Sequence, residues 1–179
     1  NGEWVDVPSD DFFNTVLTKF DALPIIAEDL GMITDEVLEV IAHFNFPGMK
    51  VLQFAFDEHL PENPYAPHNH VQNCALYTGT HDNNTSRGWF NREADTHIKG
   101  RLSHYLGKDL SQETIHEDFM RMALSSVADL AVLPMQDVLG LGADCRMNKP
   151  GVGKKNWEWR LEPSQVNDES RELLSSLTQ

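Results

Sequence analysis

The chain has 179 residues, 40% of them hydrophobic, and a formal net charge of −14, which fits one globular domain with a filled core. The acidic balance disfavours nucleic acid and anionic membrane as partners, and no apolar run is long enough to cross a bilayer. We therefore expect a cytoplasmic protein that holds Cys74 and Cys145 as thiols rather than as a disulfide.

Helical and strand patterns alternate along the chain and are separated by loops. In the first third, the expected elements are an opening loop at Asn1–Trp4, a helix over Ser9–Phe20 capped by Ser9 or Asp10, a strand over Leu23–Ala27, a helix from Thr34 and a strand over Met49–Phe56. After these elements we expect a loop over 57–73, a strand over Ala75–Thr78, and helical segments near Thr85–Leu106 and Ser111–Val127, the second with Ser111 as a cap. The last part of the chain is expected to contain a strand over Leu130–Met135, a Gly-rich turn region over Gly140–Gly153 and a helix near Glu169–Leu177.

Four apolar strands separated by helices or long loops predict an α/β fold with a parallel sheet and helical cover. Four such strands make half of an eight-stranded (β/α)8 barrel. Because the first residue is Asn1 and not Met, we expect residues 1–179 to be a partial barrel domain, a fragment of a longer chain. A half barrel exposes two unpaired sheet edges, so we expect the fragment to self-associate or to need its upstream half.

Two of these strands run into carboxylates at their C-terminal ends, where parallel α/β folds gather their chemistry. Glu28 directly follows the strand over Leu23–Ala27, and Asp82 follows the strand over Ala75–Thr78. Paired carboxylates suit glycoside chemistry, with a partly desolvated Glu28 as general acid and Asp82 stabilising an oxocarbenium-like transition state. The alternatives are a helix-capping or salt-bridged acid at Glu28 and a turn built from Asp and Asn side chains around Asp82.

The other two strands also end near polar residues, Asp57 after Met49–Phe56 and Asn148 after Leu130–Met135. Each alone is typical of a turn or a hydrogen-bonding position. Together with the two carboxylates, they place a polar residue near each of four successive strand ends. That pattern predicts a single functional edge of the sheet.

A metal site is an alternative use of the same region. His68, His70 and His81 with Asp82 offer ligand types, but their spacing matches no tight metal-binding motif. The sequence therefore favours a site without metal. The tryptophans Trp89, Trp157 and Trp159 can stack on sugars, although packing in the core is the role that the sequence favours for each.

Several segments of the chain closely resemble the 4-α-glucanotransferases, the amylomaltases or disproportionating enzymes of the α-amylase clan. The matching segments are Ile25-Ile26-Ala27-Glu28-Asp29-Leu30-Gly31, Pro47-Gly48-Met49-Lys50-Val51-Leu52-Gln53-Phe54, Tyr77-Thr78-Gly79-Thr80-His81-Asp82-Asn83, Arg146-Met147-Asn148 with Pro150-Gly151, and Asn156-Trp157 with Trp159-Arg160. The resemblance spans nearly the whole chain in the same order. It implies the C-terminal half of a catalytic (β/α)8 barrel, about strands five to eight.

The resemblance implies roles for individual residues. Glu28 matches the general acid/base, and Asp82 matches the acidic residue that holds the reacting sugar and stabilises the transition state. The substrate-binding matches are a histidine at His81 and glucose contacts at Asp29, Asp57 and Asn148. The family's nucleophilic aspartate lies in an Arg-x-Asp-His-type motif that these residues do not contain, so we expect the chain alone to be inactive.

The activity implied by the resemblance is transfer of an α-1,4-glucan segment between maltodextrins with retention, in starch and glycogen metabolism. The nucleophile forms a covalent glucosyl intermediate while Glu28 protonates the leaving oxygen, and Glu28 then deprotonates the 4-hydroxyl of the acceptor. This chemistry requires no cofactor and no metal. Two alternatives stay open: a hydrolase of the same clan, and a glucan-binding remnant without catalysis.

Overall fold

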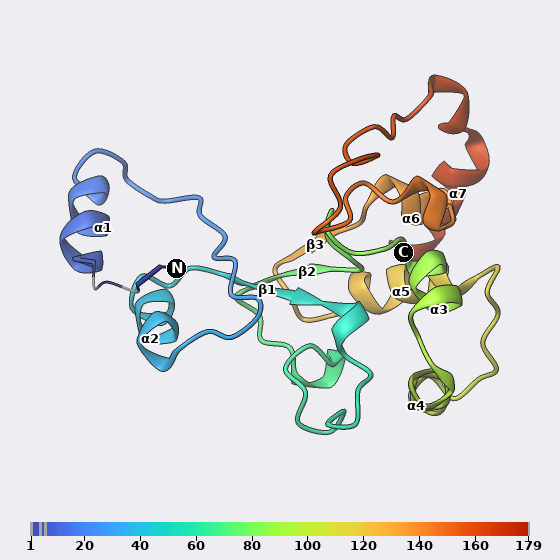
Figure 1. Ribbon diagram of the computed structural model, residues 1–179, viewed down its shortest axis with the longest axis horizontal. Coiled ribbons are helices and arrows are strands. Elements are labelled where there is room, and N and C mark those ends of the chain that lie inside the picture. The colour runs from blue at the N-terminus through green and yellow to red at the C-terminus, as the bar shows by residue number, and fades with distance from the viewer. Residues whose placement is uncertain (1, 4, 6, 179) are drawn as a thin grey trace. The chain divides into compact units, whose positions relative to one another are not determined.

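A computed structural model of the chain describes residues 2, 3, 5 and 7–178 (Figure 1). Asn1 and Trp4, at the ends of the expected opening loop, lie outside the described residues. The chain forms two compact units, residues 1–49 and residues 50–179. Among the described residues, no helix is both long and apolar enough to span a membrane.

Two helices, α1 over Ser9–Leu17 and α2 over Asp35–His43, make up the regular structure of the smaller unit. They are joined by aromatic packing, since the ring of Phe13 lies 4.8 Å from that of Phe44 and 5.0 Å from that of Phe46. The expected capping of α1 is wrong. Its N-cap position is Pro8, so Ser9 and Asp10 lie inside the first turn, where the Asp10 carboxylate complements the helix dipole.

The segment Leu23–Ala27 forms no regular strand among the described residues, which corrects one of the four expected strands. The hydrogen bonds of its backbone N–H groups explain why no strand forms. Pro24 has no N–H group, and the N–H of Ile25 bonds back to the carbonyl of Leu23 at 2.8 Å. The N–H of Ala27 reaches the carbonyl of Pro47 at 2.9 Å, and one such bond does not make a ladder.

A three-stranded sheet in the order β1-β2-β3 forms the centre of the fold (Figure 1). Its strands are β1 over Gly48–Val51, β2 over Cys74–Tyr77 and β3 over Leu130–Val132. Strands β2 and β3 are parallel, with Ala75 opposite Leu130, which confirms the α/β class with a parallel sheet. Two strands are shorter than expected, because β1 turns into a 3-10 helix at Leu52 and β3 stops before Pro134, which has no ladder donor.

The described part of residues 50–179 also contains five helices. They are α3 over Ser86–Arg92, α4 over Thr96–Leu106, α5 over Ile115–Leu124, α6 over Met135–Val138 and α7 over Asp168–Leu177. Short 3-10 helices lie at Leu52–Phe54, Pro67–Asn69, Ala143–Cys145 and Pro163–Gln165. The expected helical segment over Thr85–Leu106 is two helices, because the Asp95 carboxylate accepts the Ile98 N–H at 2.8 Å and starts α4. The hydroxyl of Ser111 bonds Glu113 at 2.6 Å and does not cap α5.

The loop over 57–73, expected from its prolines, is ordered by side-chain hydrogen bonds. The amide of Asn63 donates to the carbonyl of Phe54 at 2.9 Å, and the amide of Asn69 donates to that of Pro61 at 3.0 Å. His70 is buried between the hydroxyl of Ser126 and the carbonyl of Tyr65, at 2.8 and 2.9 Å. This burial lowers the pKa of His70, so the loop is held by a neutral imidazole at neutral pH.

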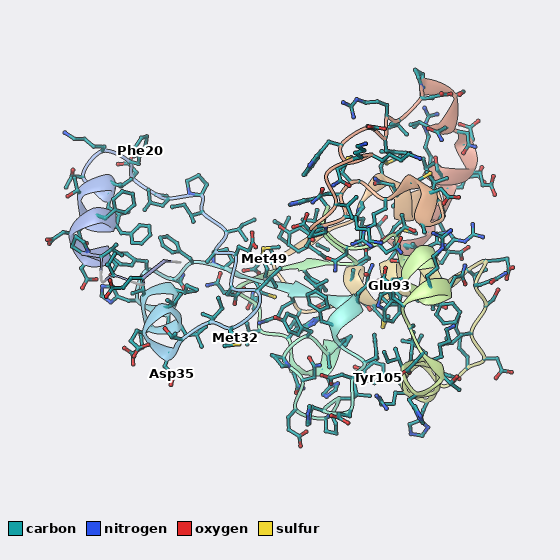
Figure 2. The ribbon with its side chains drawn as sticks, viewed as in Figure 1. Phe20, Met32, Asp35, Met49, Glu93 and Tyr105 are labelled. Atoms are coloured by element: carbon teal, nitrogen blue, oxygen red, sulfur yellow. The ribbon has the colours of Figure 1, made fainter. Side chains whose placement is uncertain are left out.

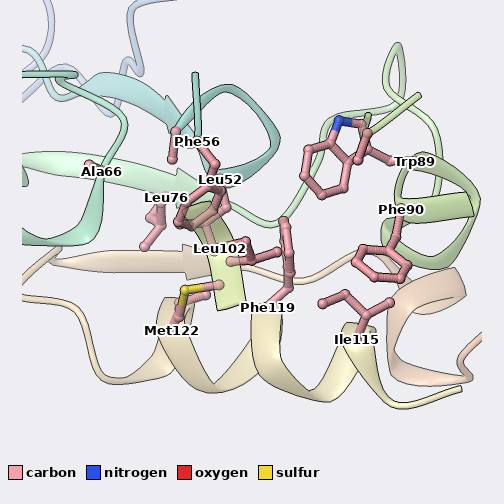
Figure 3. Packing of buried hydrophobic residues seen from close by; sticks show 13 residues of the cluster. Leu52, Phe56, Ala66, Leu76, Trp89, Phe90, Leu102, Ile115, Phe119 and Met122 are labelled. Carbon is pink, nitrogen blue, oxygen red and sulfur yellow. The ribbon is translucent and has the colours of Figure 1, made fainter. Parts of the chain in front are cut away.

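The hydrophobic core packs around α5 (Figure 3). The ring of Phe119, fully buried, lies 5.3 Å from that of Trp89 and 6.2 Å from that of Phe56. Leu76 of β2 and Leu52 after β1 complete this cluster, each fully buried and each contributing about 1.5–3 kcal/mol relative to an exposed side chain. The core therefore fixes the C-terminal end of β2, where the candidate site begins.

The two cysteines form no disulfide in the described structure, as expected. Cys74 is buried in β2, and its thiol donates to the carbonyl of Val71 at 3.0 Å. Cys145 is half-buried at the end of the 3-10 helix over Ala143–Cys145.

Candidate functional site

The turn after β2 carries His81 and Asp82. Its shape is set by Asn83, whose side-chain oxygen accepts the N–H of Thr80 at 2.9 Å and the Thr80 hydroxyl at 2.8 Å. Gly79 is needed just before it, because a Cβ there would come within 2.6 Å of the Gln53 amide nitrogen. The structure therefore confirms that polar side chains build this turn. The carboxylate of Asp82 takes no part in these bonds and is available for other contacts.

Asp82 is held from both its backbone and its side chain by a segment 66 residues further along. The amide of Asn148 donates to the Asp82 Oδ1 at 2.5 Å, and the Asn148 N–H donates to the carbonyl of His81 at 3.0 Å. Arg146 donates through Nη2 to the carbonyl of Asp82 at 2.6 Å. The structure thus brings together three predicted site residues, His81, Asp82 and Asn148, and leaves the Asp82 side chain 48% exposed toward a ligand.

Sequence reasoning did not assign a role to Arg146, which is the centre of this arrangement. Its guanidinium also lies 3.2 Å from Oε1 of Glu93, at the C-terminal end of α3 (Figure 2). The same Glu93 oxygen accepts the amide of Asn84 at 2.8 Å. Because these bonds are charge-assisted and Arg146 is largely buried, they fix the segment that carries Arg146 against the turn after β2 and the end of α3.

A second polar centre lies beneath the turn, around the buried carboxylate of Asp137. It accepts the Thr78 hydroxyl at 2.6 Å, the Ser86 N–H at 2.7 Å and the Ser86 hydroxyl at 2.7 Å. Burial raises the pKa of Asp137, and the bonds from Thr78 and Ser86 oppose that rise. Asp137 thereby ties the end of β2 to the starts of α3 and α6, and no local pattern in the sequence signals it.

A pocket of about 130 Å³ lies between these two polar centres. It is lined by the turn residues 80, 81 and 83–85, by Pro134 with Gln136–Asp137, and by Arg146–Met147. His81, one of the lining residues, also contacts two side chains outside the lining: its ring lies 5.1 Å from that of Trp157, and its Nε2 lies 3.3 Å from Oδ1 of Asp82. The region therefore combines a carboxylate, an imidazole and an aromatic ring.

Two predicted site residues belong to the smaller unit. Asp29 accepts the N–H of Met49 at 2.6 Å, and its carboxylate lies where a Cβ on residue 48 would be, so Gly48 allows this close approach. Glu28 is exposed within residues 1–49, like its neighbour Ile26, so the partial desolvation expected for it is not provided by that unit. The functional roles of Glu28 and Asp29 stay predictions.

Asp57 also stays a prediction as a glucose contact. Its Oδ1 accepts the N–H of His59 at 2.9 Å and the amide of Asn63 at 3.0 Å, so it has a structural role in the loop after β1. The side chain is exposed, which leaves its second oxygen open to solvent.

The tryptophans divide between the core and the surface. Trp89 is buried in the core, as expected, whereas Trp157 is 53% exposed, so the expectation of core packing is wrong for Trp157. The difference has a local cause, because the Trp157 ring lies against His81 in the turn after β2.

Two of the three histidines considered as metal ligands, His68 and His70, are engaged elsewhere. His68 contacts the Tyr105 hydroxyl at 3.0 Å and the carbonyl of Pro61 at 3.1 Å, and both ring nitrogens of His70 have partners within its loop. Within the described part of the chain, no three or more His, Cys, Asp or Glu side chains are grouped closely enough to hold a metal ion.

A family model described as 4-alpha-glucanotransferase matches residues 1–166. The chain belongs to this family. It is 49% identical over 181 residues to the 4-alpha-glucanotransferase of Synechocystis sp., a match that covers all of this chain and 35% of that protein. It is 42% identical to the 4-alpha-glucanotransferase of Thermus thermophilus, covering 99% of this chain and 36% of that protein.

The fold agrees with that of a solved family member. An amylomaltase from Streptococcus agalactiae, determined in complex with acarbose, superposes with a TM-score of 0.91 at 34% sequence identity. The superposition covers 99% of this chain and 35% of that one. The chain therefore spans about a third of the length of the curated relatives that it matches.

Proposed function

We propose that residues 1–179 form the C-terminal half of a catalytic (β/α)8 barrel, about strands five to eight, within a longer 4-alpha-glucanotransferase. The complete protein transfers an α-1,4-glucan segment between maltodextrins with retention. Family membership over residues 1–166 supports this, as does coverage of about a third of the relatives' length. We also propose a cytoplasmic location, which fractionation of the source cells tests.

The observation that carries the proposal is the oriented carboxylate of Asp82. Asn148 donates to this carboxylate and Arg146 donates to the Asp82 backbone carbonyl, yet nearly half of the side chain is exposed. A carboxylate fixed in advance stabilises positive charge that develops at an anomeric carbon without reorganising during the reaction. His81 and Asn148 lie beside it, where their ring and amide would contact sugar hydroxyls.

The remaining roles follow from the resemblance. Glu28 protonates the glycosidic oxygen as the nucleophile, supplied by another part of the protein, attacks the anomeric carbon. Glu28 then takes the proton from the 4-hydroxyl of the acceptor, and the covalent bond to the nucleophile breaks. Asp29 and Asp57 bind flanking glucose units. The acarbose bound to the Streptococcus agalactiae relative supports an oligosaccharide as the ligand.

The test is maltotriose disproportionation by the complete protein with Asp82→Asn. The variant keeps an oxygen for Asn148 but loses the charge, so we expect transfer to fall at least about 10²-fold with an unchanged melting temperature. Asp144→Asn is the matched control, because it neutralises a carboxylate that is 93% exposed and paired with Arg92.

The products distinguish the alternatives. Glucose together with maltodextrins longer than maltotriose indicates transfer. Glucose and maltose alone indicate a hydrolase, and acarbose binding without turnover indicates a glucan-binding remnant. An Asp82→Asn variant as active as wild type contradicts the assignment of Asp82.

A further inference from the structure

Trp157 is an exposed aromatic side chain on a backbone that disfavours it. The residue is 53% exposed and has φ +64°, in the left-handed region that non-glycine residues rarely adopt. Lys155, two residues earlier, has φ +61°. Such conformations persist only where the surroundings fix them, and they gather at ligand-binding sites.

The hydrogen bonds that fix this segment come from Asn156 and from its neighbours. The Asn156 side chain accepts the N–H of Lys149 at 2.9 Å and donates to the carbonyls of Lys149 and Val152 at 3.2 and 2.7 Å. The N–H of Trp157 donates to the carbonyl of Met147 at 2.8 Å, and Arg160 donates to the Trp157 carbonyl at 2.8 Å. The ring is therefore presented at the surface by a closed loop.

The ring lies against His81, the residue next to Asp82. Its centroid is 5.1 Å from that of the His81 ring, with 38° between the planes, and His81 in turn contacts Asp82 at 3.3 Å. Met147, which anchors the Trp157 backbone, directly precedes Asn148. His81 thus lies between an exposed aromatic ring and an oriented carboxylate, and His81 itself lines the pocket.

We propose that Trp157 is a sugar-stacking residue that binds a glucosyl unit of the maltodextrin next to Asp82. This inference rests on the proposed function and adds a binding residue to it. A glucopyranose ring has an apolar face of axial C–H groups, which packs on an aromatic face, while its hydroxyls need polar partners around the rim. Trp157 supplies the aromatic face, and Asp82 and His81 supply the polar partners.

The test compares Trp157→Ala, Trp157→Phe and the control Trp159→Ala in the complete protein. Maltotriose disproportionation gives KM and kcat, and calorimetry gives the Kd of acarbose. We expect Trp157→Ala to raise KM and Kd about tenfold, which corresponds to about 1.4 kcal/mol, with kcat within about threefold of wild type. Trp157→Phe keeps a ring and should recover most of the loss. Trp159→Ala removes the same side chain two positions away and should leave both constants unchanged.

Unchanged KM and Kd in Trp157→Ala overturn the inference, as does a loss that appears in kcat and melting temperature alone. Trp157→Gly accommodates φ +64° without strain and gives a folded comparison where the alanine variant melts early. Wild-type protein that binds acarbose but does not transfer glucan contradicts the proposed function, while the Kd of the variants still decides the role of Trp157. Wild-type protein that does not bind acarbose contradicts both.

Discussion

Asn148 makes contacts that its sequence match alone does not imply. The resemblance makes it a glucose contact, whereas in the structure its amide donates to the carboxylate of Asp82 and its N–H to the carbonyl of His81. An amide can donate to both a sugar and a carboxylate, so the two roles are compatible. The hydrogen bonds to Asp82 and His81 make Asn148 a positioning residue for Asp82.

This role predicts the effect of Asn148→Ala in the complete protein. Asp82 loses one of its two anchors, so we expect kcat for maltotriose disproportionation to fall about 10- to 100-fold, the range typical of residues that orient a functional group. Steady-state kinetics separates the two roles. A rise in KM with unchanged kcat would mean that Asn148 only binds glucose.

The candidate site residues that the structure brings together are ones that the strand-end rule groups. His81 and Asp82 lie in the turn after β2, and Asn148 lies in the region after β3, so the rule that chemistry gathers at strand ends predicts that they are close. Their functional roles stay predictions. Arg146 and Glu93 were missed, because their contact joins positions 53 residues apart and leaves no local pattern.

At the scale of the elements, Asp137 connects β2, α3 and α6 through three hydrogen bonds in the protein interior. Asp137→Ala removes the acceptor and leaves two hydroxyls and one N–H of Thr78 and Ser86 buried. Each unpaired buried group costs about 1–3 kcal/mol, so we expect the variant to lose about 3–5 kcal/mol of unfolding free energy.

Urea unfolding of the complete protein measures this change, with Asp137→Asn as the conservative comparison. The amide keeps one acceptor oxygen and should cost less than alanine. An alanine variant within about 0.5 kcal/mol of wild type, the range of a neutral surface substitution, would show that the three donors find other partners.

A helix or strand was predictable from the sequence where its signals lie within or next to its own residues. The helix α7 and the strand β2 were expected within a residue or so, because capping residues and apolar runs mark them. The break between α3 and α4 was missed although Asp95 carries a readable N-cap signal. The expected strand over Leu23–Ala27 failed because a strand depends on donors and partners outside its own residues.

At the scale of the whole molecule, the meeting of Glu28 and Asp82 in one cleft is a prediction about the complete protein. Glu28 belongs to residues 1–49 and Asp82 to residues 50–179, which form separate compact units. The smaller unit also exposes apolar side chains, among them Phe12, Phe20 and Met32 (Figure 2). Exposed apolar residues of this kind fit a surface covered by protein, and the self-association expected from the sequence stays a prediction.

Glu28→Gln tests the acid/base role in the complete protein. The amide cannot protonate the leaving oxygen, so we expect transfer to fall at least about 10²-fold, the lower range of general acid–base catalysis. The melting temperature should not change, because the substitution is isosteric and Glu28 is exposed within its unit. Glu39→Gln, an exposed glutamate of α2 in the same unit, is the matched control.

A crystal structure of the complete protein supplies the geometric check. Carboxyl groups of Glu28 and Asp82 more than about 12 Å apart are too far apart to flank one sugar, and that result would remove Glu28 from the site whatever the kinetics show.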